Sequence, residues 1–183
     1  MPALGYSWGE TAAERAAAYP CDGLVDPVHQ TCYRAISVRA PAPVVWRWLC
    51  QLRAAPYSYD WIDNLGRRSP RELTPGLDQL EVGHKAMAIF RIAGFERARS
   101  LTLYCARSIF GELAVSYCVT PTTDDAARIT VKLLVRYPHL AWLMRRVPPV
   151  GDLVMMRKQL RTLAALAERD HLRDLSEDLK KGL

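Results

Sequence analysis

The stretch that decides the fold is PAPVVWRWLCQLRAAPYSYDWIDNL, residues 41–65. Its prolines suit the first turn of a helix, in which Val45, Trp48 and Leu49 recur at the three- and four-residue spacing of one buried face. The helix leads into a loop that is rich in aromatic residues, 56–61. Aromatic rings with polar tips on a loop suit the mouth of an apolar pocket. The stretch therefore predicts an amphipathic helix that ends beside a pocket rim.

On both sides of this stretch, apolar and polar residues alternate in the way that predicts β-strands. The clearest alternation places Ile129, Val131, Leu133 and Val135 on one face. Strands with one apolar and one wet face are typical of an antiparallel sheet. Residues 122–127 form the expected hairpin turn before the last strand, and Gly94 a turn or bulge. The expected strands are residues 31–40, 84–92, 99–108, 111–121 and 128–138.

Helices are predicted at both ends of the chain. Residues 10–18 have helix-forming composition, and 139–146 are a short candidate that Val147, Pro148 and Pro149 break. Residues 151–172 give the longest helical pattern, and the charged tail 171–183 is expected to fray. The apolar stripe of the long helix is Leu153, Met156, Leu160, Leu163 and Ala167, widened by Met155 and Leu166.

The length of 183 residues and the absence of repeats predict one domain over 1–183. Its core is expected at about 31–170, after an N-terminal extension, 1–30. The net charge is +6, but the basic residues are spread among acidic ones, so we expect no nucleic-acid partner. The chain shows no transmembrane run and no secretory signal. Five widely spaced cysteines, an odd number, fit reduced thiols, which predicts a cytoplasmic protein.

Catalytic and metal-binding motifs have weak support. Residues 5–9, GYSWG, match the letters of a nucleophile elbow, but too few residues precede Ser7 to supply the strand that an elbow needs. The four histidines have no metal-ligand spacing, and no phosphate-binding glycine motif occurs. We therefore expect no metal, no cofactor and no identifiable catalytic residue.

The strings W-x-W-L-x-Q (Trp46–Gln51) and YSYDWIDNL (Tyr57–Leu65), followed by L-x-V-G-H before the next strand, carry a resemblance. Together with the order of strands and helices, they resemble the START-related SRPBCC superfamily, in its bacterial polyketide cyclase/dehydrase-like subgroup. The resemblance covers roughly residues 31–170. It implies an α+β helix-grip fold, in which a curved antiparallel sheet wraps around a long C-terminal helix and leaves an apolar cavity. The family binds lipids, sterols and polyketides without a shared catalytic triad.

The candidate ligand-binding residues fall into two groups. Those near the aromatic loop are expected at the pocket rim, although the same residues also suit a structural loop. The others are expected to line a cavity, although methionine and aromatic residues are equally common in a filled core. Trp48 lies on the apolar stripe and is expected in the core. The rim candidates are Trp46, Tyr57, Tyr59, Asp60, Trp61 and Asn64, and the lining candidates are Met87, Phe90, Tyr117, Trp142, Met155 and Met156.

Three hypotheses about function follow. The first is a carrier, sensor or sequestering protein for a small hydrophobic ligand such as a lipid, sterol or polyketide. The second is a polyketide cyclase or aromatase that uses the same cavity, with acid or base groups among Tyr57, Tyr59, Asp60 and Tyr117. The third is a protein-interaction module with a filled core. A homodimer is compatible with each, and basic residues near the loop (Arg53, Arg67, Arg68 and Arg71) suit a solvated face or an anionic headgroup.

Overall fold

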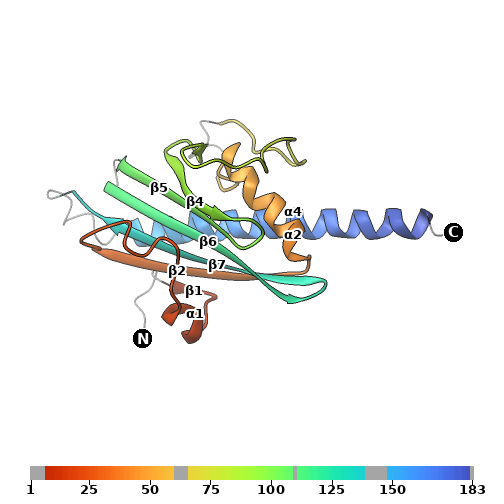
Figure 1. The fold of residues 1–183 in the computed structure, drawn as a ribbon, viewed down its shortest axis with the longest axis horizontal. Helices are drawn as coiled ribbons and strands as arrows, with labels where there is room; N and C mark the ends of the chain where they lie inside the picture. Colours follow the sequence, from red (N-terminus) through yellow and green to blue (C-terminus); the bar gives the residue numbers. More distant parts are fainter. Residues whose placement is uncertain (1–6, 60–65, 109–110, 139–147, 182–183) are drawn as a thin grey trace.

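A seven-stranded sheet with a long helix across one face forms the body of the protein (Figure 1). The computed structural model describes residues 7–59, 66–108, 111–138 and 148–181, and the side chains of the long helix from Val154 onward. The strands are β1 Ser7–Trp8, β2 Gln30–Val38, β3 Lys85–Ala86, β4 Phe90–Glu96, β5 Ser100–Ser108, β6 Gly111–Thr123 and β7 Ala126–Arg136. The helices are α1 Ala12–Ala16, α2 Ala42–Cys50, the short 3-10 helix η1 Gln51–Arg53, and α4 Pro148–Lys181.

The strand order is β1-β2-β7-β6-β5-β4-β3, and neighbours are antiparallel except for β1, which is parallel to β2. The predicted helix-grip (START-like) α+β fold is confirmed, with one correction: the sheet is mixed rather than purely antiparallel. The parallel pair depends on Gly9, which follows β1 at φ +78°. A Cβ at that position would lie 2.2 Å from the carbonyl oxygen of Ala35, so only glycine allows β1 to lie this close to β2.

The inner face of the sheet, toward α2 and α4, is apolar. The predicted alternation in β7 is confirmed, because Ile129, Val131, Leu133 and Val135 are all buried in the main core. From α4, Leu160 and its neighbours one turn apart pack into the same core. The hairpin turn expected over 122–127 is shorter in the structure, where only Asp124 and Asp125 lie between β6 and β7. Alternation thus decides which face of the sheet receives the helix.

The helix predicted from the opening stretch is confirmed as α2, with Pro43 in its first turn. Val45, Trp48 and Leu49 are completely or almost completely buried, so the predicted apolar face is correct. The Trp48 indole Nε1 donates a hydrogen bond of 2.9 Å to the Asp170 carboxylate on α4. This bond satisfies the only polar atom of a buried indole and ties the two helices together.

The strand predicted over 84–92 is wrong. The chain instead forms β3, a turn, and β4, because Met87 and Ala88 adopt left-handed backbone angles, φ 43° and 62°. The Met87 backbone N–H donates to the Leu52 carbonyl oxygen at 2.9 Å, which draws the turn toward η1. The predicted irregularity at Gly94 is confirmed, since the register with β5 shifts between Ile92 and Gly94.

The N-terminal segment, from Ser7 onward, contributes β1, α1 and a path that packs on the sheet. The helix predicted over 10–18 is shorter, Ala12–Ala16, and begins with a capping box between Thr11 and Glu14. After α1 the chain crosses the outer face of the sheet, where Tyr19, Cys21 and Val25 are buried. They pack against Ala114 of β6 and Leu134 of β7. The expectation of a wet outer face is therefore wrong along this path.

The C-terminal helix is longer at both ends than the predicted 151–172. Pro148 and Pro149 lie in its first turn, where their missing N–H groups need no partner. The predicted fraying tail is helical to Lys181, and Arg47 and Glu72 make ion pairs with Asp174 and Arg173, at 3.5 and 3.1 Å. The helix expected at 139–146 lies outside the described residues. Within the described part of the chain, no helix has the length and apolarity to cross a bilayer.

Candidate functional site

A small polar cluster lies inside the apolar interior. The Tyr117 hydroxyl, on the inner face of β6, donates to Gln159 Oε1 of α4 at 2.7 Å. Gln159 Nε2 donates to the Pro56 carbonyl oxygen at 2.6 Å and lies 3.1 Å from the Met87 sulfur. We call Tyr117, Gln159, Met87 and the Pro56 carbonyl the interior polar cluster. It joins the sheet, the long helix, the aromatic loop and the β3–β4 turn at one point.

The wall around this cluster is apolar. Leu101 and Leu103 of β5, Val115 of β6, and Leu160 and Leu163 of α4 are all at most 1% exposed and belong to the same core. Among the described residues, no aspartate, glutamate or histidine is buried. Neutral hydrogen-bonding groups in an apolar wall can orient the polar end of a greasy molecule.

One residue of the interior polar cluster and one beside it have strained backbones. Tyr57, next to Pro56, has φ 57°, and Met87 has φ 43°. Non-glycine residues in this region cost about 1–3 kcal/mol each and persist only where the surroundings hold them. Tyr57 is buried, and its ring packs edge-to-face on Trp48 with the centroids 6.0 Å apart. The two segments that meet Gln159 are therefore held under strain.

The structure brings together only some of the predicted site residues. Met87 and Tyr117 are members of the interior polar cluster, and Tyr57 follows the Pro56 carbonyl that belongs to it. Tyr59 is half-buried two residues further along. Of the remaining candidates, Trp46 and Met156 are buried core residues, Phe90 and Met155 are half-buried, and Asp60, Trp61, Asn64 and Trp142 lie outside the described residues.

Sequence reasoning missed two interior polar residues. Gln159 lies between Met156 and Leu160 on the buried side of α4, and a polar residue within an apolar stripe is the signal that was available. Arg34 is only 1% exposed and shares the inner face of β2 with Cys32, so it interrupts an apolar alternation in the same way. One Arg34 nitrogen donates to the Tyr33 carbonyl oxygen at 2.7 Å.

The strongly perturbed titratable groups among the described residues do not belong to the interior polar cluster. On the outer side, an ion pair with Arg128 lowers the pKa of Glu14 to about 2. Burial raises the pKa of the Cys118 thiol to about 11 and that of the Cys50 thiol, on α2, to about 12. A raised thiol pKa makes a cysteine a poor nucleophile. These shifts report burial and ion pairing rather than an acid or base prepared for catalysis.

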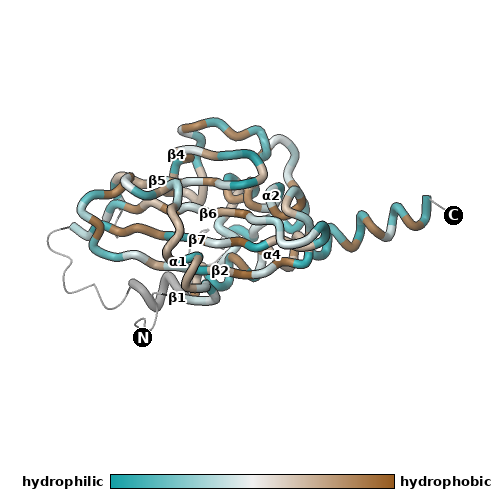
Figure 2. Tube along the Cα trace, turned by 60° about the horizontal axis from the view of Figure 1, so that its bottom comes forward, coloured by the Kyte–Doolittle hydropathy of each residue, from teal (hydrophilic) through white to brown (hydrophobic). Residues whose placement is uncertain are grey.

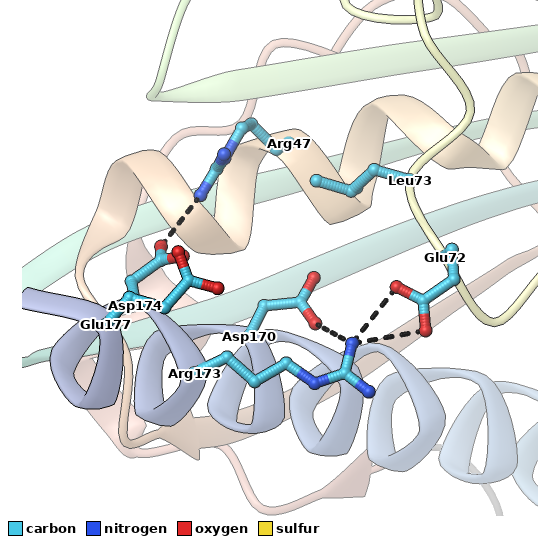
Figure 3. A pocket seen from close by; sticks show the side chains of 7 residues that line it. All are labelled: Arg47, Glu72, Leu73, Asp170, Arg173, Asp174 and Glu177. Carbon is cyan, nitrogen blue, oxygen red and sulfur yellow. Dashed lines mark hydrogen bonds and ion pairs between the residues drawn. The ribbon is translucent and has the colours of Figure 1, made fainter. Parts of the chain in front are cut away.

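A polar pocket of about 280 Å³ opens at the surface between α2 and the C-terminal part of α4 (Figure 3). Arg47 and Arg173 reach across it to the carboxylates of Asp174 and Glu72. Its lining is mostly charged, and most of these charges pair with one another, which does not suit an apolar ligand. The residues that line it are Arg47, Glu72, Leu73, Asp170, Arg173, Asp174 and Glu177.

Two other sequence features have structural roles. Ser7 lies within β1 instead of following a strand, so GYSWG is not a nucleophile elbow. Arg53 donates to the carbonyl oxygens of Gly76, Leu77 and Gln79 at 3.0–3.3 Å and holds that turn, whereas Arg67, Arg68 and Arg71 are exposed.

Within the ranges described, no group of three or more histidine, cysteine, aspartate or glutamate residues is arranged to hold a metal ion.

Comparison with known proteins gives structural neighbours but no sequence relative. Neither a protein-family model nor a curated protein matches the sequence. A hypothetical protein from Helicobacter pylori superposes with a TM-score of 0.52 at 14% identity, covering 83% of this chain and 96% of that one.

Two further neighbours have lower TM-scores. A START superfamily protein from Mycobacterium smegmatis gives 0.45 at 13% identity, covering 78% of this chain and 97% of that one. The di-domain ARO/CYC BexL from the BE-7585A biosynthetic pathway gives 0.46 at 16% identity, covering 76% of this chain. This chain spans only 46% of the BexL chain. At such identities the comparisons concern the fold alone.

Proposed function

We propose that this protein binds a small hydrophobic molecule between the inner face of its sheet and α4, as a carrier, sensor or sequestering protein. The observation that carries the proposal is the Tyr117–Gln159 hydrogen bond, a neutral polar pair enclosed by an apolar wall. A ligand hydroxyl or carbonyl group replaces one partner of this pair, while the remainder of the ligand contacts leucine and valine side chains. Apolar burial contributes about 25 cal/mol per Å², and the polar pair sets orientation.

The strained turn offers a path to this site. Met87 contacts Gln159 from the β3–β4 turn, and Met87 and Ala88 both occupy unfavourable backbone angles. A rearrangement that withdraws Met87 recovers part of the strain and frees the Gln159 amide for a ligand. The Met87 side chain is also flexible and ends in a thioether, so it can adapt to different neighbours. We propose that the ligand enters past this turn.

We favour binding over catalysis because of the groups present. A cyclase or aromatase needs an acid or base held against the substrate. In the described interior, no carboxylate or imidazole is buried, and the ionisable groups on the inner face include tyrosine hydroxyls and the always-charged guanidinium of Arg34, which is a poor acid or base. The proposed partner is thus a small hydrophobic molecule, not a nucleic acid, and we propose that the reduced protein works in the cytoplasm.

Native mass spectrometry of gently purified protein tests the proposal. We expect an adduct of about one molecule per chain that is released on denaturation and is apolar with one hydroxyl or carbonyl end. A protein that carries no adduct and binds no apolar fluorescent probe would contradict the proposal and favour a filled core.

Matched variants then test the polar pair. Tyr117→Phe is expected to weaken probe or ligand binding about fivefold to tenfold, the value of one hydrogen bond. Tyr104→Phe removes a hydroxyl that bonds Glu112 at 2.5 Å on the other face of the sheet, and it should leave binding unchanged. Equal losses in both variants would mean that the interior polar cluster does not contact the ligand.

A further inference from the structure

The C-terminal end of α4 carries an apolar stripe that is exposed among the described residues. Leu172, Leu175 and Leu179 are 65%, 46% and 71% exposed. Their spacing of three and four residues places them on one side of the helix. In Figure 1 this end of α4 projects beyond the sheet, and Figure 2 shows hydrophobic and hydrophilic residues alternating along it. We call Leu172, Leu175 and Leu179 the leucine stripe.

The leucine stripe does not continue the buried face of the helix. At 100° per residue, it is turned roughly 120° around the axis from the direction of Leu160, Leu163 and Ala167, which belong to the main core. A longer sheet would contact the face of α4 that carries Leu160, and it would leave these leucines exposed. They form a second contact surface on the same helix, and their 3-4 spacing is that of a two-helix seam.

The charge of this segment disfavours an anionic partner. Residues 169–181 hold four basic and four acidic side chains, whereas the whole chain has a net charge of +6. Two copies repel each other over most approaches, and the repulsion is least at a charge-balanced helix that projects from the body. A balanced segment has little attraction for an anionic membrane or a nucleic acid. The charges in it are Arg169, Arg173, Lys180 and Lys181 against Asp170, Asp174, Glu177 and Asp178.

We propose that the leucine stripe binds the same stripe of a second copy of this chain, with the two helices antiparallel. In that arrangement the two positively charged bodies lie at opposite ends of the seam, and the helix dipoles oppose each other. Leu172 of each copy then lies opposite Leu179 of the other, and the two Leu175 side chains pack together near the centre of the seam. Because few side chains are buried, we expect a reversible dimer with a dissociation constant on the order of micromolar. The dimer is independent of the ligand proposal.

Sedimentation velocity over a wide concentration range tests the dimer. The wild-type protein is expected to change from monomer to dimer, and Leu172→Gln/Leu179→Gln to remain monomeric with unchanged circular dichroism. Glutamine is a good helix former, so the helix is retained. The control Val82→Gln/Ile89→Gln removes two exposed apolar side chains, 68% and 49% exposed, from the body and should dimerise like the wild type.

Three results would overturn the proposal. A wild-type protein that remains monomeric at millimolar concentration has no such dimer. A double leucine variant that dimerises as well as the wild type has another interface. A monomeric protein that sediments with phosphatidylcholine–phosphatidylglycerol vesicles, and loses this on Leu172→Gln/Leu179→Gln, uses the leucine stripe on lipid instead.

Discussion

The two faces of the sheet are both covered, but by different chemistry. On the outer face, Lys132 pairs with Asp22 at 2.5 Å and its ammonium lies 5.4 Å and 5.6 Å from the ring centroids of Tyr19 and Tyr33. On the inner face, the enclosed polar contacts of the interior polar cluster are neutral, as between Tyr117 and Gln159. Charged pairs hold the N-terminal segment in one place, whereas neutral pairs in an apolar wall can exchange partners with a ligand.

This difference separates a structural face from a binding face. Replacements on the outer face should change stability and leave ligand binding alone. Replacements near the interior polar cluster should change binding more than stability, except where they put a charge into the core.

The largest expected effect is at Leu160, which is fully buried where α4 meets the inner face. Leu160→Asp places a carboxylate in the core and removes apolar contacts, so we expect a loss of more than about 4 kcal/mol and no cooperative unfolding. Thermal denaturation followed by circular dichroism measures it. The exposed neighbour provides the control Arg161→Asp, and a Leu160→Asp protein that melts like the control would mean that the helix faces another way.

On the outer face, Tyr19→Ala is expected to cost about 3 kcal/mol, because a buried ring over Lys132 is lost. Tyr19→Phe keeps the ring and removes only a hydroxyl that donates to the Glu14 carbonyl at 2.9 Å, so it should cost about 1 kcal/mol. Urea unfolding measures both. If Tyr19→Ala weakens ligand binding as much as Tyr117→Phe does, the division between the two faces does not hold.

Glu14 gives the outer face a pH dependence. Arg128 holds the folded-state pKa of Glu14 at about 2, below the ordinary 4.5, so its contribution to stability is complete above about pH 4.5 and is lost as the pH falls toward 2. Glu14→Gln should therefore cost about 1–2 kcal/mol at pH 7, since the pair is partly exposed, and less at pH 3. Urea unfolding at the two pH values measures the change. Glu96→Gln, at an exposed pair with Arg99, is the control and should cost under about 0.5 kcal/mol.

The smallest effect on stability is expected at Tyr59, which is half-buried beyond Tyr57 on the aromatic loop. Tyr59→Ala should weaken binding of an apolar probe about fivefold and change the free energy of unfolding by less than about 1 kcal/mol. Fluorescence titration and urea unfolding on the same sample give both values. Unchanged affinity with a large loss of stability would assign the loop a structural role.

The fold was predictable where one local pattern decides it. The alternation in β7 and the apolar spacing in α2 each reflect the burial of one face. A buried face can be recognised from the sequence because its residues are apolar. The β3–β4 turn was not predictable, because Met87 and Ala88 leave the strand conformation for a long-range hydrogen bond to Leu52. The course of the chain around Tyr19 across the outer face was also missed, since loop composition does not reveal what a loop covers.

The candidate site was predictable in part. Tyr117 and Met87 follow from the resemblance and from residue type, but their meeting with Gln159 depends on how α4 is rotated against the sheet. Pro56 contributes a backbone carbonyl, a group that every residue carries, so no sequence pattern marks it. Trp46, two residues from Trp48, is buried in the same core although it points to another side of α2, because the elements around α2 cover more than one of its faces.

The two edge strands of the sheet affect how readily the protein aggregates during storage and expression. In the part of the chain that the structure describes, the end strands β1 and β3 each have two paired residues, Ser7–Trp8 and Lys85–Ala86. Such short outer strands offer few free N–H and C=O groups in a row, so another chain finds little template on which to add a strand. Concentrated solutions of the protein should therefore resist fibre formation, and any association at high concentration should reverse on dilution.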